Sequence, residues 1–186
     1  ILTNLIHEID LLRFICGDIA TVSAEITHHD QKFAKEDAVA MTMKFANSAI
    51  GSFVLSDRTP TPWTWEMALG ENSKFPKSGQ NAIRFMGTKG ALEFPNLVLW
   101  SHSDSEGNWQ DEIQSEVIEM PFVDAYVEQC QHLCAVVQGT QMPIIDAANG
   151  TRSLDATLAT VRAATEGTRV ILDLSSYQDR ENILDD

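Results

Sequence analysis

Three shortages limit what this chain can be. It has only three cysteines, Cys16, Cys130 and Cys134, so it lacks a disulfide framework and we expect a reducing, cytoplasmic setting. It has no apolar run near the roughly 20 residues that span a bilayer. Lys and Arg total 13 against 27 Asp and Glu, and this net charge of −14 argues against nucleic acids and membranes as partners.

Self-sufficient catalytic motifs are also missing. The sequence contains no G-x-G-x-x-G and no G-x-S-x-G. Residues 87–90, Gly-Thr-Lys-Gly, lie between two expected strands, which favours a hairpin turn over a phosphate-binding loop. His28, His29 and Asp30 fall at a strand end without a clear cluster of partners, which favours a solvated turn over a metal site. We therefore expect no bound metal.

The hydrophobic patterns predict runs of one element type rather than strict alternation of strands and helices. Helices are expected over residues 1–16, 123–138 and 147–166. Strands are expected over residues 19–30, 37–46, 49–56, 64–69, 82–86, 91–94, 97–100, 116–120 and 169–174. This order predicts an α+β fold, with one large, mostly antiparallel sheet and the helices packed on one face.

The residue patterns of individual strands and helices predict which of their faces are buried. In the strand 49–56, Phe53 and Leu55 alternate with Val54, so we expect both faces to be buried, one of them by another subunit. In the helix 123–138, Cys130 and Cys134 share a face and are expected to be small core residues. The positions with helical spacing in the helix 147–166 are Leu154, Leu158, Val161 and Ala164.

Two segments are open to more than one interpretation. Trp63 and Trp65 flank a single residue after a proline-rich loop, and alternation along an expected strand would place both on one face. They form either a core plug or one wall of a pocket for a polar ligand. Residues 175–186 are polar and acidic, and we expect this tail to extend from the body or to dock on another subunit.

The first helix is the most informative stretch. Asn4, His7 and Asp10 recur every three residues. An apolar stripe on another side consists of Leu5, Ile9 and Leu12. A histidine near a helix start suits proton transfer. The simpler alternative is a partly buried surface helix in which the hydrogen-bonding groups of the histidine are satisfied and the residue has no catalytic role. A metal-dependent hydrolase that uses His7, Asp10 and His28 or His29 is a further, poorly spaced alternative.

Several motifs occur in one order along the chain. They are the H-x-x-D helix of residues 4–17, Gly70-Glu71-Asn72, the hairpin Phe85-Met86-Gly87-Thr88-Lys89-Gly90-Ala91-Leu92, and the segments 139–143, 150–154 and 166–170. Together they resemble the C-terminal domain of the Gfo/Idh/MocA oxidoreductases, the relatives of glucose-fructose oxidoreductase and inositol dehydrogenase. The resemblance covers residues 1–174 and leaves out the tail.

The resemblance implies a substrate-binding and oligomerisation domain over residues 1–174. Family members place a Rossmann domain before it, which binds NAD or NADP, so we expect this chain to be the second part of a longer protein. The sheet commonly forms homodimers or homotetramers, and the substrate is a hydroxyl-bearing sugar, polyol or related compound. The alternative is a non-catalytic sheet domain used for assembly or carbohydrate binding.

The resemblance also implies roles for individual residues. The catalytic histidine of the family falls on His7, which would exchange a proton with the substrate hydroxyl while a lysine from the Rossmann domain assists. Thr3 stands where many members carry an aspartate, and Asn4 could hydrogen-bond a hydroxyl without ionising. The residues expected to bind substrate are Asn4, Asp10, Arg58, Trp63 and Trp65.

Overall fold

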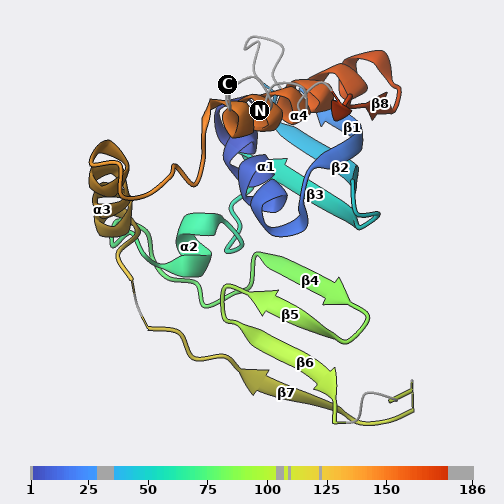
Figure 1. Cartoon of the computed structure of the whole chain (residues 1–186). Coiled ribbons are helices and arrows are strands. Elements are labelled where there is room, and N and C mark those ends of the chain that lie inside the picture. Colours follow the sequence, from blue (N-terminus) through green and yellow to red (C-terminus); the bar gives the residue numbers. More distant parts are fainter. Residues whose placement is uncertain (1, 29–35, 104–106, 109, 122, 176–186) are drawn as a thin grey trace. The chain divides into compact units, whose positions relative to one another are not determined.

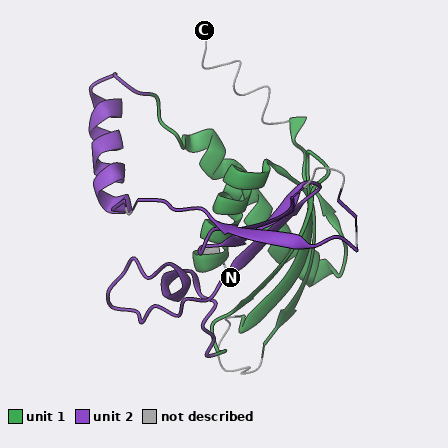
Figure 2. Ribbon diagram, turned by 90° about the horizontal axis from the view of Figure 1, so that it is seen from below, with its two compact units in different colours: residues 1–59, 142–186 green, residues 60–141 purple. Residues whose placement is uncertain are grey.

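The chain forms two compact units, shown in different colours in Figure 2. A computed structural model describes residues 2–28, 36–103, 107–108, 110–121 and 123–175. One unit combines residues 1–59 with 142–186, and the other comprises residues 60–141. His29 and Asp30 lie outside the described residues, and so does the expected tail after Ser175. Each unit is described below by itself.

The first unit contains two helices and one antiparallel sheet (Figure 1). Its elements are α1 (Leu2–Cys16), β1 (Ile19–Thr27), β2 (Ala38–Phe45), β3 (Ile50–Ser56), α4 (Ala147–Glu166) and β8 (Val170–Ile171). The strand order is β3-β2-β1-β8, and neighbouring strands are antiparallel. The expected hairpin of β2 and β3 is confirmed, whereas the expected final strand is shortened to two residues.

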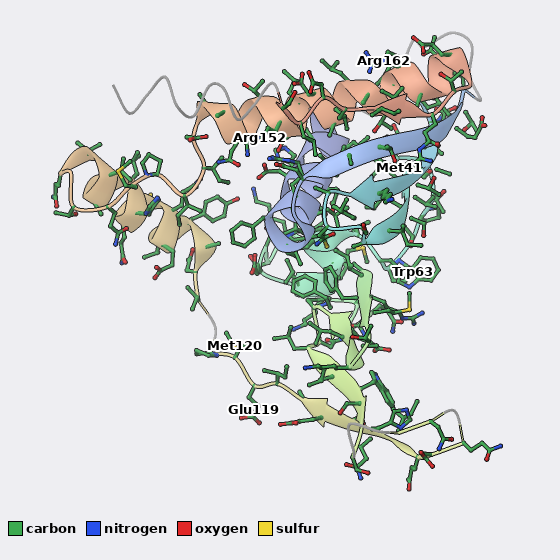
Figure 3. The ribbon with its side chains drawn as sticks, turned by 45° about the vertical axis from the view of Figure 1, so that its right-hand side comes forward. Met41, Trp63, Glu119, Met120, Arg152 and Arg162 are labelled. Carbon is green, nitrogen blue, oxygen red and sulfur yellow. The ribbon has the colours of Figure 1, made fainter. Side chains whose placement is uncertain are left out.

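Helices α1 and α4 supply the apolar residues that pack on one face of this sheet. Strand β2 shows the alternation most clearly, because Val39, Met41, Met43 and Phe45 are buried while the residues between them are exposed. Met41 is labelled in Figure 3. The core cluster consists of Leu5, Ile9, Ile19, Val22, Met41, Met43, Phe45 and Ala156. Full burial of each large apolar side chain stabilises the fold by about 1.5–3 kcal/mol.

Helix α4 buries small residues rather than its leucines. Its buried residues are Ser153, Ala156, Thr157, Ala159, Thr160 and Ala163. Leu154 and Leu158 are 43% and 46% exposed, so the buried face suggested by their spacing is wrong. The Thr157 and Thr160 hydroxyls donate to carbonyl oxygens one turn earlier, at 2.7 and 3.0 Å. Burial of these threonines therefore leaves no hydroxyl unsatisfied, and their small size allows the helix to approach the sheet closely.

Both ends of α4 are defined by specific capping residues. The Asp146 side chain accepts a hydrogen bond from the backbone N–H of Asn149 at 2.7 Å, which caps the first turn. Gly167 ends the helix with a φ of 63°, a conformation that glycine adopts without strain. These signals confirm the expected helix over residues 147–166.

The second unit contains another antiparallel sheet and two helices. Its elements are α2 (Trp65–Leu69), β4 (Ile83–Gly87), β5 (Gly90–Phe94), β6 (Val98–His102), β7 (Ile113–Val117) and α3 (Ala125–Val137). The strand order is β4-β5-β6-β7. The tight turn between β4 and β5 confirms the hairpin expected at residues 87–90. The α+β class is thus confirmed, but the strands form two sheets where one large sheet was expected.

The expected strand over residues 64–69 is wrong. This segment is the helix α2, because the Thr64 hydroxyl caps it by accepting from the Met67 N–H at 3.3 Å. Gly70 ends it with a φ of 69°. Trp65 is therefore the first residue of a helix, and the alternation that would place it on one face with Trp63 does not exist.

Helix α3 differs from expectation in its burial. None of its residues is buried, and both Cys130 and Cys134 are exposed, so they are not core residues in this structure. Its exposed apolar side chains include Tyr126 and Val137, each 79% exposed. Among the described residues, no helix combines the length and apolar character needed to cross a membrane.

Candidate functional site

Helix α1 buries two residues of its apolar stripe and exposes polar residues of its first two turns. Leu5 and Ile9 are fully buried under the sheet, as the apolar stripe predicts. Asn4 and His7 are exposed. Among the residues that the structure describes, none forms a hydrogen bond to the His7 imidazole. The ring is therefore available to exchange a proton with a bound molecule.

Asp10 is directed toward α4. The Ser153 hydroxyl donates to Asp10 Oδ1 at 2.6 Å and accepts from Arg13 Nη1 at 2.7 Å. Arg13 Nη1 lies 3.8 Å from the same Asp10 oxygen. This chain of three side chains connects α1 to α4 and holds Asp10, one turn after His7, in a fixed direction.

Arg13 is the centre of this network and is only 8% exposed. Its Nε and Nη2 donate to Asp18 Oδ1 at 3.0 and 2.6 Å, and its Nη1 also donates to the Asn149 carbonyl oxygen at 3.0 Å. Arg152, labelled in Figure 3, contacts the other Asp18 oxygen at 3.5 Å. A buried guanidinium of this kind is tolerated only when its donors are satisfied, so the network fixes α1 in one orientation.

The candidate residues named from the sequence do not include Arg13, Asp18 or Ser153. Arg13 had a local signal, because it lies three residues after Asp10 on the same helix. Ser153 had no such signal in the sequence, since it is 143 residues from Asp10 in the chain and lies next to Leu154, whose helical spacing suggested a buried face. Only the packing of α4 against α1 reveals this contact.

Cys16 is the last residue of α1, and burial raises the pKa of its thiol above the usual value. The described residues also contain no group of three or more His, Cys, Asp or Glu side chains that could hold a metal ion. His29, part of the metal-dependent alternative, lies outside the described residues.

The other candidate residues belong to segments of the chain other than α1. Arg58 follows β3 and pairs through Nε with Asp37 Oδ1 at 2.7 Å, so its charge is already partly compensated. Trp63 and Trp65 belong to the second unit, whereas His7 belongs to the first. Trp63 is 62% exposed, and Trp65 stacks on Phe94 with ring centroids 5.4 Å apart. Of the two, only Trp63 has its ring largely open to a ligand.

A family model for the GFO/IDH/MocA C-terminal domain matches residues 1–93, half of the chain. The chain belongs to this family. The match spans the elements from α1 into β5, so it includes His7, Asp10, Arg58 and both tryptophans. Ser153 lies beyond the matched residues. The search of the curated proteins found no match.

Solved structures with this fold include several oxidoreductases. The WlbA dehydrogenase from Bordetella pertussis, in complex with NADH and UDP-GlcNAcA, is 18% identical with a TM-score of 0.56, over 91% of this chain and 43% of its own. An oxidoreductase from Agrobacterium radiobacter, in complex with NAD+, L-tartaric acid and magnesium, is 17% identical with a TM-score of 0.65, and the match covers 92% of this chain and 48% of that one. The aldose-aldose oxidoreductase from Caulobacter crescentus, complexed with glycerol, is 19% identical with a TM-score of 0.61, and the match covers 90% of this chain and 46% of that one.

These similarities establish the fold of the Gfo/Idh/MocA domain. The chain spans less than half the length of each of these three solved structures. Within the domain, the orientation of α1 is fixed by the Arg13 network and by the buried Leu5 and Ile9. The geometry thus provides one exposed, rigidly mounted imidazole.

Proposed function

We propose that this chain is the substrate-binding and oligomerisation part of an NAD(P)-dependent oxidoreductase. Its substrate is a hydroxyl-bearing sugar, polyol or related compound. Membership in the family supports this proposal, as do the NADH and NAD+ complexes and the sugar-related ligands of similar structures. The observation that carries it is the exposed His7 on a helix held by the buried Leu5 and Ile9 and by the hydrogen bond from Ser153 to Asp10.

His7 is the residue to which we assign the proton transfer. Oxidation of an alcohol carbon leaves a developing carbonyl group, so the hydroxyl proton needs an acceptor. The unprotonated nitrogen of a neutral imidazole suits this role near neutral pH. To Asn4, one turn before His7, we assign the orientation of a second hydroxyl through its exposed side-chain amide. Asp10, one turn after His7, remains a proposed substrate-binding residue, although its Oδ1 already accepts a hydrogen bond from Ser153.

The nicotinamide cofactor supplies the hydride chemistry, but the described residues of this chain do not fit its pyrophosphate. A dinucleotide site needs a glycine-rich turn between a strand and a helix, whereas all the strand pairs here are antiparallel. We therefore assign cofactor binding mainly to a separate Rossmann domain of a longer protein. We propose the cytoplasm as the location.

A substrate screen tests this function. The full-length protein is incubated with NAD+ or NADP+ and a panel of sugars, polyols and sugar acids, and formation of the reduced cofactor is followed by absorbance. We expect turnover with at least one hydroxyl-bearing compound. Binding of carbohydrates without any cofactor reduction would favour the non-catalytic sheet domain, in which His7 is structural.

A further inference from the structure

Trp63 carries a large apolar ring that the fold leaves mostly in solvent. The residue is 62% exposed, and Figure 3 shows its ring projecting from the ribbon. Among the residues that the structure describes, Trp65 stacks on Phe94, whereas Trp63 has no aromatic partner. A molecule bound on the indole of Trp63 would therefore remove a large apolar area from water.

The backbone that leads into Trp63 is braced. Pro60 and Pro62 each fix a φ angle of this loop. The Trp63 N–H donates to the Thr61 hydroxyl at 3.3 Å. The Ser78 hydroxyl donates to the Pro62 carbonyl oxygen at 2.7 Å. The residue just before the exposed ring is thus tied to a second loop of the same unit.

The segment that follows Trp63 is attached to the sheet of its own unit. Trp65, the first residue of α2, stacks on Phe94 of β5 with an angle of 28° between the ring planes. The Ser78 N–H donates to the Met67 carbonyl oxygen at 2.8 Å, which closes the loop after α2 onto this helix. With both neighbours of Trp63 held, little conformational freedom remains to be lost when a ligand binds its ring.

The face of an indole selects among neutral, hydroxyl-bearing ligands. It is the negative side of a quadrupole and attracts the weakly positive hydrogens of C–H groups. The chair of a pyranose sugar presents several C–H groups together on one side of the ring, with its hydroxyls around the edge. An open-chain polyol rotates about each C–C bond, so it must lose conformational entropy to present such a patch. An exposed, braced indole therefore favours the ring-closed sugar.

We propose that Trp63 is a stacking platform for the ring of a pyranose sugar, so that the substrate class is a ring-closed sugar rather than an open-chain polyol. This inference rests on the proposed function and narrows its substrate. The two tryptophans then have different roles. Trp65 packs on Phe94 and supports the loop, and Trp63 contacts the ligand.

Calorimetric titration of the full-length protein tests this selectivity. The ligands are matched pairs that differ in ring closure: methyl glucopyranoside with glucitol, methyl galactopyranoside with galactitol, and methyl mannopyranoside with mannitol. A methyl glycoside cannot open its ring, so each pair compares a closed ring with an open chain. We expect at least one glycoside to bind about tenfold more tightly than its alditol.

Variants of Trp63 assign the selectivity to its ring. Trp63→Ala is expected to raise the Kd of the bound glycoside about tenfold and to change the Kd of its alditol about twofold or less. Trp63→Phe keeps an aromatic face and is expected to recover most of the affinity. Tyr126→Ala is the matched control, since it removes a 79% exposed aromatic side chain from α3 of the same unit and is expected to leave both Kd values unchanged. The thermal unfolding midpoint of Trp63→Ala is expected to stay unchanged, because the ring is exposed.

Proton NMR of the bound glycoside gives a readout that a structural role of Trp63 would not produce. Hydrogens that lie over an aromatic face shift upfield, so we expect such a shift on one side of the sugar ring and its loss in Trp63→Ala.

Three results would overturn the inference: no glycoside binds, every pair binds with equal affinity, or Trp63→Ala leaves the glycoside Kd unchanged. Equal weakening of glycoside and alditol in Trp63→Ala would also contradict it, as would a Trp63→Phe variant as weak as Trp63→Ala. Because the readout is binding, a protein that binds a glycoside through Trp63 but reduces no cofactor would count against the proposed function alone. Turnover of open-chain polyols that is insensitive to Trp63→Ala, without binding of any glycoside, would overturn this inference and leave the function intact.

Discussion

Ser153 on α4 donates a 2.6 Å hydrogen bond to Asp10 on α1, across 143 residues of sequence. Ser153 is only 2% exposed, and its oxygen also accepts from Arg13. The helix that carries His7 is therefore attached to the fold through a buried polar contact in addition to its apolar stripe. Two predictions concern this attachment.

Replacing Ser153 by Ala removes a hydroxyl that is both donor and acceptor. We expect Ser153→Ala to lower the free energy of unfolding by about 1–3 kcal/mol, because Asp10 and Arg13 each lose a buried partner. Urea unfolding followed by circular dichroism measures this change. Thr165→Ala is the control, since it removes an exposed hydroxyl from the same helix and is expected to change stability by about 0.5 kcal/mol or less. Equal effects of the two variants would contradict a structural role for the network.

Arg13→Met keeps much of the side-chain volume but removes the charge at the centre of the network. We expect a loss of about 3–5 kcal/mol in the free energy of unfolding, because Asp18 and Asp10 keep their charges without the buried guanidinium. Arg13→Lys restores the charge without the fork of donors and is expected to recover part of the loss. A neutral or stabilising effect of Arg13→Met would show that the network does not hold α1 in place.

The start of α4 gives a prediction about pH. Hydrogen bonding from the backbone N–H of Asn149 lowers the pKa of the exposed Asp146 carboxyl below its usual 3.8. A depressed folded-state pKa means that the cap stabilises the fold above pH 3.8, and that this contribution is lost as the pH falls through the lower folded-state value. Asp146→Asn keeps the accepting oxygen but cannot titrate. We therefore expect the difference in Tm between the two proteins to shrink on acidification, as measured by thermal unfolding from pH 6 to about pH 2.5; a constant difference would contradict the assignment.

Elements with clear local signals could be predicted from the sequence. The alternation around Met41 and Met43 identified β2, and the helical spacing of Leu154 and Leu158 identified α4. The segment after Trp63 was misread as a strand because one hydrogen bond, from the Met67 N–H to the Thr64 hydroxyl, turns it into a helix. Local periodicity does not reveal such a capping contact.

Long-range packing was harder to foresee. Leu154 and Leu158 have the spacing of a buried face, but α4 lies on the sheet through alanines and threonines instead. When apolar and polar residues occur on both faces of a helix, the sequence does not indicate which face packs against the sheet. For the candidate site, the helix of His7 was identified from sequence, whereas its connection to Ser153 depends on tertiary structure alone.

Asn4 provides a test of substrate orientation. We expect Asn4→Ala in the full-length protein to raise KM about fivefold to tenfold with little change in kcat, because one hydrogen bond to a hydroxyl is lost in both ground and transition states. The neighbouring Thr3→Ala serves as the control, since Thr3 is also exposed on the first turn and is expected to leave both constants unchanged. An effect of Asn4→Ala confined to kcat would instead assign this side chain to the chemical step.

The proton transfer that we assign to His7 is tested most directly by the kcat of His7→Ala in the full-length protein. We expect a fall of about 10²–10⁴-fold with an unchanged unfolding midpoint, since His7 is exposed and has no hydrogen-bond partner among the described residues. His28→Ala, a change of another exposed histidine of the first unit, is expected to keep full activity. An unchanged kcat in His7→Ala on a substrate that the unsubstituted enzyme turns over would contradict the account.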